Sequence, residues 1–489
     1  MISLTYVSFN YYILLAALVV LYYILPLKYR WCVLLAGSGL FYYLAMERRM
    51  QLIIFAFSVG ISYLFGILIQ HLRECESTLL TRRLIFVLGI ILSVFPLLGS
   101  KCTDLIMGSA LHGQTISWII PLGLSFYSLQ VIAYLADVAK GSIECQKNPL
   151  KYALFISFFP QIIQGPIPRY QQLEEQLFQG HRYDSDRFMK GIQLIIWGFF
   201  LKFMIANKAS VIVDTVFNNS TVYLGWYVLV AGILYSFQLY ADFQACVSLS
   251  QGAAQLFGIK LIDNFNHPYF SVSVKDFWRR WHISLSSWLR DYIYIPLGGS
   301  RKGQFRKYVN LVITFAVSGI WHGATWKYLF WGLMHAGYQI VGDLTNSIQQ
   351  KIYSFLHIPI ESRVCVAIRR FITFYFVMLA WIIFRADTLK SGINMIRSMF
   401  TFHNLWVLLD DSWFRLGLNQ KEGEVLCLSL LVLLVISTFQ EKGIIIRDWF
   451  NRQCLIVRWG IYLCTICSIW VLGTYGYGFD ANDFIYGGF

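Results

Sequence analysis

One histidine stands inside a strongly apolar stretch of the chain. His322 lies in VSGIWHGATW, between Trp321 and Gly323, where the surrounding residues are typical of a membrane interior. An ionisable side chain in the membrane interior is costly to desolvate and marks a functional site by default. A neutral imidazole suits removal of a proton from an alcohol, because burial keeps it uncharged near neutral pH. The alternative is a structural histidine, hydrogen-bonded between helices.

The residues around His322 narrow the chemistry. No Ser or Cys nucleophile adjoins it and no cluster of ligands surrounds it, so we expect no metal. Cys464 and Cys467 form a CxxC, but they lie in an apolar segment without a nearby His. Walker A, Gly-x-Ser-x-Gly and HExxH sequences are absent. Direct acyl transfer from an activated donor to a hydroxyl therefore fits better than a Ser-His-Asp mechanism.

A second histidine, His282, lies in a basic stretch. Residues 271–307 contain eight Lys or Arg against Asp276 and Asp291. In a membrane protein this pattern indicates a cytoplasmic loop near anionic headgroups rather than a nucleic-acid site.

The stretch KDFWRRWHISLSSWLRDYIYIPLGG has helical periodicity, with an aromatic stripe and a polar stripe. The aromatic stripe is Trp278, Trp281, Leu285, Trp288 and Tyr292; the polar stripe is Arg279, His282, Ser286 and Arg290. The pattern predicts one amphipathic helix in the bilayer interface, ending before Pro296. His282 would then either pack at headgroup level or help to orient the site that contains His322.

The composition indicates the class of protein and the kind of elements that must position these residues. The chain has 489 residues, of which 57% are hydrophobic and only 13% charged, whereas a soluble protein carries roughly 25% charged residues. We expect an all-α polytopic membrane protein with about 11 to 13 embedded segments. The clear apolar runs are 9–26, 51–70, 84–99, 188–205, 222–240, 369–384, 424–439 and 456–474, and the more broken ones are 31–45, 115–136, 150–166 and 308–341.

The run that contains His322 is too long for a single straight span. Residues 308–341 would extend roughly 51 Å as one helix, against a hydrocarbon core of ~30 Å. The run should therefore be tilted, broken or re-entrant, and the break is expected where Gly319 and Gly323 flank His322. Irregular backbone at that depth must be buried in protein or line a cavity.

The beginning of the chain resembles no cleaved signal, because it has no basic n-region and Lys28 and Arg30 follow directly. We expect the first run to remain as a span. Five basic residues would face the cytoplasm if the N-terminus lies outside, against three on the other side: Lys28, Arg30, Arg73, Arg82 and Arg83 against Arg48, Arg49 and Lys101.

Two motifs together resemble a known family. FWRRWHISLSSWLRDYIYIPLGGSRKG, followed by SGIWHGATWKYLFWGLMH, is similar to the signature region of the membrane-bound O-acyltransferase (MBOAT) family. The likeness is greatest to its bacterial branch of alginate and polysaccharide O-acetyltransferases, which is related to the teichoic acid D-alanyl transfer protein. Further stretches, FYSLQVIAYLADV, NPLKYALFISFFPQIIQGPI and YSFQLYADF, extend it over about residues 122–341, within one membrane domain of residues 1–489.

The resemblance implies a ring of helices around a thin centre, with funnels from both faces that meet near His322. It implies that His322 and His282 are the residues tied to activity, and it makes Trp281 and Trp321 funnel candidates. The donor would be acetyl-CoA or an acyl-carrier phosphopantetheine, bound as a substrate rather than as a tight cofactor. Arg279 and Arg280 would attract this anionic donor at the cytoplasmic mouth, or would simply anchor the loop.

One position departs from the family pattern. Where relatives often have Asp-Phe-Ser-Gly-Tyr-Ser-Asp, this chain has Asp242-Phe-Gln-Ala-Cys-Val-Ser248. No acidic role is carried over to Ser248. Asp242 is either a site residue or a buried pairing partner.

The chain ends in DFIYGGF, and three aromatic residues in so short a tail should dock on the protein or a partner. By resemblance, Phe484 and Phe489 would dock and Tyr486 would accept the acyl group as a phenolic ester. The next step would be transfer to an extracellular partner with a hydrolase-like acetyltransferase fold.

These observations predict an acyltransferase of the bacterial cell membrane that acetylates an extracellular or cell-wall polysaccharide, with no nucleic-acid partner and with an acyl carrier protein as one candidate donor. D-alanyl transfer to teichoic acid is the alternative within the family. A transporter or flippase for a lipid-linked sugar is the alternative from another class, although repeat symmetry typical of transporters is not visible.

Overall fold

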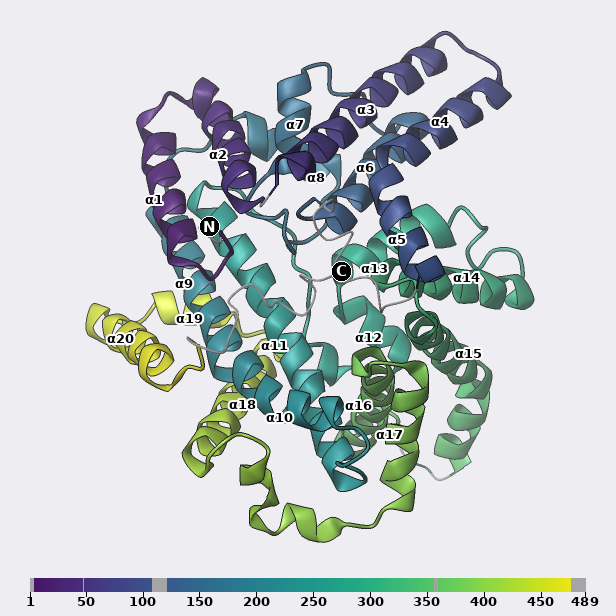
Figure 1. Ribbon diagram of the computed structural model, residues 1–489, viewed down its shortest axis with the longest axis vertical. Coiled ribbons are helices and arrows are strands. Elements are labelled where there is room, and N and C mark those ends of the chain that lie inside the picture. Colours follow the sequence, from purple (N-terminus) through teal and green to yellow (C-terminus); the bar gives the residue numbers. More distant parts are fainter. Residues whose placement is uncertain (1–3, 47, 108–120, 356, 358, 476–489) are drawn as a thin grey trace. The chain divides into compact units, whose positions relative to one another are not determined.

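The computed structural model describes residues 4–46, 48–107, 121–355, 357 and 359–475. Every regular element in this described part is a helix (Figure 1). The prediction of an all-α protein is therefore confirmed.

The chain divides into two compact units. Among the described residues, the first unit is formed by the chain up to Ile195 and by Cys246–Asp263, and the second by Ile196–Ala245 and by the chain from Asn264 onward. Among the described residues the chain passes between them three times: within α9 (Ser185–Phe200), within α11 (Trp226–Leu256), and after Asp263, between α11 and the next helix.

The other elements of the first unit are α1 (Phe9–Ile24), η1 (Leu27–Tyr29), α2 (Arg30–Ala45), α3 (Arg49–Glu74), α4 (Leu79–Ser93), α5 (Phe95–Met107), α6 (Leu124–Lys140), α7 (Pro149–Ser157) and α8 (Tyr170–Phe178). The other elements of the second unit are η2 (Leu201–Ala206), α10 (Asn207–Asn218), η3 (Pro268–Phe270), α12 (Val274–Arg280), α13 (Ile283–Leu289), η4 (Arg290–Tyr294), α14 (Gln304–His322), α15 (Trp326–Phe355), α16 (Arg363–Arg385), α17 (Leu389–Thr401), η5 (Leu405–Leu408), η6 (Asp411–Arg415), α18 (Gln420–Glu441), α19 (Ile446–Asn451) and α20 (Leu455–Leu472).

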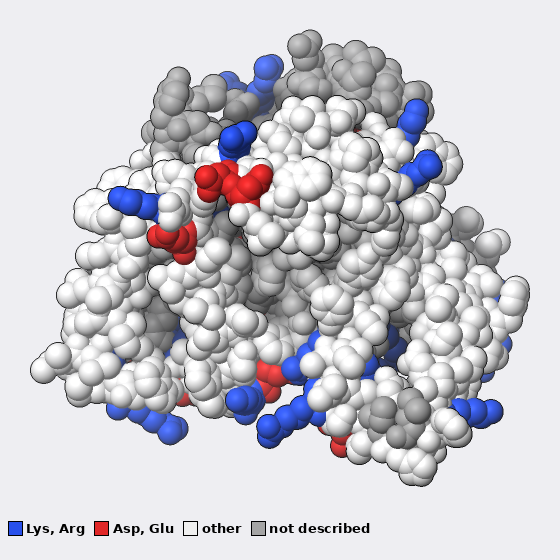
Figure 2. All heavy atoms as spheres, turned by 90° about the horizontal axis from the view of Figure 1, so that it is seen from below, with Lys and Arg blue, Asp and Glu red and all other residues white. Residues whose placement is uncertain are grey.

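Five helical stretches in the described residues are long and apolar enough to cross a membrane. They are α3, the continuous run Ser185–Asn218, α16, α18 and α20. The pair α4 and α5, bent by 63°, is a sixth candidate, and α1 is a shorter apolar helix. The number of these spanning candidates is smaller than the number of embedded segments expected from the sequence. Several of the expected segments form helices that are shorter or more polar. Many large apolar side chains on these helices are exposed, as contact with lipid requires, and Figure 2 shows broad areas without charge.

The apolar run 150–166 does not form a spanning helix. Helix α7 ends at Ser157, and the following prolines and Gly165 keep the chain irregular as far as α8. This segment is nevertheless buried, so its backbone needs internal partners. The Tyr6 hydroxyl donates to the carbonyl oxygen of Pro160 at 2.8 Å, and the Ser38 hydroxyl accepts from the Phe159 N–H at 3.2 Å. Apolar composition alone predicted a helix here, but the prolines prevent the helix from continuing.

Candidate active site

His322 is the last residue of α14, where the long apolar run breaks. The backbone leaves the helix at Gly323, and α15 begins at Trp326 and packs against α14. Two glycines permit this packing: a Cβ on Gly319 would collide with the carbonyl oxygen of Tyr328, and one on Gly332 with that of Phe315. The predicted break beside His322 is confirmed.

The His322 ring lies in an aromatic cage. It is 2% exposed, with ring centroids at 4.8 Å to Trp321, 5.1 Å to Trp331 and 5.5 Å to Phe384. Trp331 comes from α15 and Phe384 from α16, so three helices surround the imidazole. The cage excludes water, which strengthens the interactions of any charge that develops there.

A third buried histidine, His335, belongs to the same cluster and escaped the sequence analysis. Its ring centroid lies 5.1 Å from that of Trp331, and its Nδ1 accepts a hydrogen bond from Trp278 Nε1 at 3.2 Å. The bond connects α15 to α12 and fixes the indole of Trp278. The available signal was its spacing: His335 follows Trp331 by one helical turn.

The region around His282 is not one amphipathic helix, and that prediction is wrong. Helix α12 ends at Arg280, and His282 adopts a left-handed backbone conformation with φ of 45° before α13 begins. The cause is Asn264, which lies 18 residues earlier in the sequence. Its carbonyl oxygen accepts the Ile283 N–H at 2.9 Å, and its side-chain Oδ1 accepts the Ser284 N–H at 3.1 Å. Asn264 therefore caps α13 and stops the helix from continuing.

This capping also orients the imidazole of His282. Because Asn264 Oδ1 accepts the backbone N–H of Ser284, it is fixed as an acceptor, and His282 Nδ1, at 3.2 Å, must donate to it. The Nε2 atom then carries the lone pair. His282 is 1% exposed and lies outside the candidate spanning helices, and burial lowers its pKa to about 3. It is a buried, neutral imidazole rather than a headgroup-level residue.

The structure brings the two predicted histidines to one tryptophan. The Trp321 ring lies 6.3 Å from that of His282 and 4.8 Å from that of His322. Phe243 of α11 packs edge-on against His282 at 4.8 Å. Trp281 is buried and packs against Trp381 at 5.1 Å, in the wall behind this cluster.

Asp242, one residue before Phe243, is a buried pairing partner. Lys202 Nζ lies 2.6 Å from Asp242 Oδ1, and both side chains are almost fully buried. Lys202 belongs to the π-helical turn η2, a distortion that often occurs at functional sites. An ion pair at this depth is retained because either charge alone would be costly to bury.

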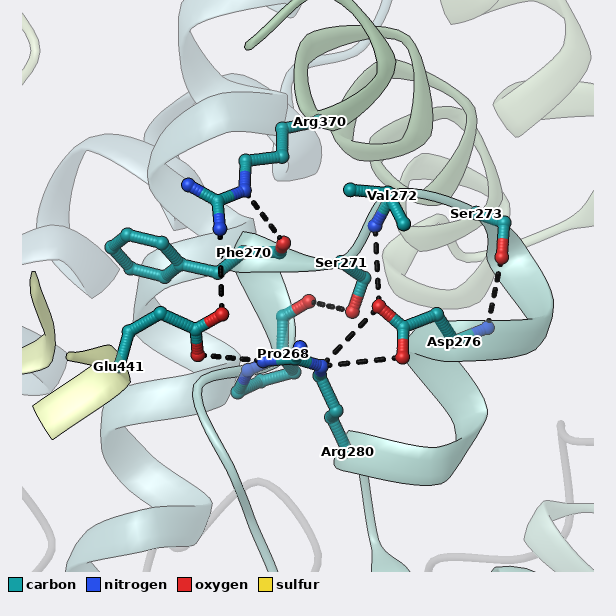
Figure 3. Close-up of polar contacts among 9 residues, drawn as sticks. All are labelled: Pro268, Phe270, Ser271, Val272, Ser273, Asp276, Arg280, Arg370 and Glu441. Atoms are coloured by element: carbon teal, nitrogen blue, oxygen red, sulfur yellow. Dashed lines mark hydrogen bonds and ion pairs between the residues drawn. The ribbon is translucent and has the colours of Figure 1, made fainter. Parts of the chain in front are cut away.

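The two predicted donor-side arginines differ in their surroundings. Arg279 is exposed. Arg280 instead forms ion pairs with Asp276 at 3.3 Å and with Glu441 of α18 at 2.7 Å, as Figure 3 shows. Arg280 therefore ties α12 to α18, and only Arg279 is presented outward.

The candidates in the aromatic tail, Phe484, Tyr486 and Phe489, lie outside the described residues.

Comparison with known proteins identifies the family. The model of the membrane-bound O-acyltransferase family matches residues 146–384. The chain is 32% identical over 428 residues to the probable alginate O-acetylase AlgI of Pseudomonas aeruginosa, a match that covers 84% of this chain and 77% of that protein. The chain belongs to the membrane-bound O-acyltransferase family. This MBOAT is therefore a multi-pass membrane enzyme, an O-acyltransferase, and the alternative of a transporter is set aside.

Two further relatives span the family's bacterial branch. This MBOAT is 35% identical over 349 residues to the peptidoglycan O-acetyltransferase of Helicobacter pylori, covering 65% of each chain. It is 28% identical over 314 residues to the teichoic acid D-alanyltransferase of Bacillus subtilis, covering 61% of this chain and 77% of the other. The family match includes both histidines. It begins at residue 146, later than the predicted core of residues 122–341, and ends beyond that core at Phe384 of α16.

Proposed function

We propose that this enzyme transfers an acetyl group from a cytoplasmic thioester towards hydroxyls of an extracellular or cell-wall polysaccharide, with His322 as the catalytic base. The observation that carries the proposal is the burial of His322 in an aromatic cage at the break between α14 and α15. The O-acetylating relatives, one named for alginate and one for peptidoglycan, supply the acceptor class.

The chemistry is a direct displacement at the thioester carbonyl. The acceptor oxygen bonds to the carbonyl carbon while His322 takes the hydroxyl proton, the carbon–sulfur bond then breaks, and the proton passes from His322 to the departing thiolate. A neutral imidazole is the right starting state, because an imidazolium has no lone pair for the proton. His282 would assist through Trp321, which contacts both rings.

The donor would be acetyl-CoA or an acyl carrier protein that bears acetylated phosphopantetheine. Arg279 is the exposed arginine available to attract such an anion, since Arg280 is engaged by Asp276 and Glu441. On the far side, Tyr486 would take the acetyl group as a phenolic ester and pass it to an extracellular partner of hydrolase fold. Phe484 and Phe489 would dock that tail.

The test is a His322→Ala strain in which ester-bound acetate on the polymer is measured after mild alkaline release. We expect at least a hundredfold loss of acetate with polymer export and protein level unchanged, and no loss for His71→Ala, a histidine exposed on α3. Unchanged acetylation in the His322→Ala strain would overturn the proposal. Release of D-alanine instead of acetate would assign the enzyme to the D-alanylating alternative, which the Bacillus subtilis relative represents.

A further inference from the structure

The second unit contains a cavity that lies apart from the histidine cluster. It has a volume of about 270 Å³ and is lined by residues of α11, η3, α16 and α18. Two of its wall residues, Tyr240 and Tyr269, pack against Trp281 with ring centroids 6.3 and 6.1 Å away. A layer of aromatic side chains therefore separates the cavity from His282.

The body of this cavity is apolar. Phe237, Phe374, Leu433 and Leu434 supply much of its wall. Smaller apolar cavities in proteins bind hydrocarbons. Its volume is slightly below that of sites for drug-sized ligands, which suits one narrow alkyl chain.

The position of the cavity decides which alkyl chain can reach it. Helices α16 and α18, which form two of its sides, are both candidate membrane spans. Leu434 lines the cavity and is also 52% exposed, on the face of α18 where Leu431 and Val435 are exposed. The rim therefore faces the bilayer, and the chains present there are those of phospholipids.

One end of the cavity is polar and cationic. Arg370 lines it, stacks on Phe270 at 5.0 Å, donates from Nε to the Phe270 carbonyl oxygen at 2.9 Å, and reaches Glu441 Oε1 at 3.3 Å (Figure 3). These contacts use two of its five N–H donors, and the side chain remains 34% exposed. Glu441 is shared, because Arg280 Nη1 holds its other oxygen at 2.7 Å.

The ion pairs at this end join two arginines, Arg280 and Arg370, to two carboxylates, Asp276 and Glu441, and leave further N–H donors of Arg370 available. Four further basic residues adjoin these side chains in the sequence: Lys275, Arg279, Arg369 and Lys442. In addition, His267, which lines the cavity, has a buried Nδ1 atom without a hydrogen-bond partner in the described part of the chain. Basic pockets between membrane helices are suited to anionic lipid headgroups.

We propose that this cavity binds one acyl chain of an anionic membrane phospholipid and that Arg370 contacts the lipid phosphate. The lipid would fill the space between α16, α18 and η3 and would support the wall behind Trp281. This site is separate from acyl transfer, so its test does not depend on the proposed function.

The experiment uses the full-length protein in non-ionic detergent, with phosphatidylglycerol or phosphatidylcholine of identical chains added. Retained lipid is counted by native mass spectrometry, and the shift in melting temperature is recorded. We expect the wild type to retain phosphatidylglycerol at least tenfold more than phosphatidylcholine. Arg370→Gln should lose this preference, whereas Arg363→Gln, an exposed arginine at the start of the same helix, should keep it.

A second pair of variants tests the cavity itself and does not depend on the arginine. Phe374→Trp should fill the space and lose both lipids, whereas Ile372→Trp, on the exposed face of α16, should retain them. Equal retention of the two lipids by the wild type, or wild-type retention by Phe374→Trp, would overturn the proposal. Equal stabilisation by inorganic phosphate would show an anion site without a lipid chain, and would also overturn it.

Discussion

Three buried histidines of the second unit share an aromatic environment. His282, His322 and His335 are 1%, 2% and 0% exposed, and each ring lies within about 6.5 Å of a tryptophan ring. Burial lowers the pKa of His282 and of His335 to about 3, because the desolvation cost falls on the charged form. The proposed proton abstraction from an alcohol by His322 needs a neutral imidazole.

The buried state of His282 makes folding depend on pH. Its pKa is about 3 in the folded protein, against 6.5 for an exposed histidine. Between pH 6.5 and pH 3, therefore, His282 is protonated in the unfolded chain but neutral in the folded protein. The contribution of His282 to the free energy of unfolding is therefore fully present above pH 6.5 and is lost progressively as the pH falls towards 3. By pH 5 the loss should be about 2 kcal/mol.

This dependence is measured by thermal unfolding of the detergent-solubilised protein between pH 7 and pH 5, compared with His282→Gln. Glutamine does not titrate and still donates a hydrogen bond towards Asn264 Oδ1. The difference between the two curves isolates His282 from the other histidines and from the carboxylates. Parallel curves would show that His282 is not held neutral in the folded protein.

At the level of elements, the sequence predicted the features that residues close together in the chain determine. The break beside His322 follows from the glycines of the motif and from the length of the apolar run. The break at His282 does not, because it depends on Asn264, and the tie between Arg280 and Glu441 joins residues 161 positions apart. The hydrogen bond of His335 is also long-range, because its partner, Trp278, lies on another helix; only the one-turn spacing from Trp331 was visible in the sequence.

The close packing of α14 and α15 gives a prediction at this scale. Gly332→Ala should destabilise the protein and reduce acyl transfer, because the new Cβ would collide with the carbonyl oxygen of Phe315 and push apart the two helices that hold His322 and Trp331. We expect a cost of about 1–3 kcal/mol, typical of overpacking, measured as a lower melting temperature.

Gly337 is the matched control on the same helix. A Cβ at that position would meet nothing within 4 Å, so Gly337→Ala should be neutral, or stabilising by up to about 1 kcal/mol, through helix propensity alone. If the two alanine variants behave alike, the close approach of the helices is not what Gly332 provides.

For the whole molecule, hydropathy predicted the class and the principal spans, because about 20 consecutive apolar residues are the length that a membrane helix needs. Runs 51–70, 188–205, 369–384 and 424–439 fall within spanning candidates, and run 456–474 overlaps the candidate that ends at Leu472. At 150–166, one of the more broken apolar runs, the segment is buried inside the protein and is not a spanning helix. Composition alone does not distinguish contact with lipid from contact with protein.

The orientation of the molecule follows from its charge and has a direct test. The basic loop between α12 and α14 should lie in the cytoplasm, since short loops rich in Lys and Arg remain on that side. A protease recognition sequence inserted after the exposed Ser300 should therefore be cut in inverted membrane vesicles and after solubilisation, but not from outside intact cells. Cleavage from outside would place Arg279 on the acceptor side of the membrane. A cytoplasmic thioester could then not bind Arg279, and this result would contradict the proposed direction of transfer.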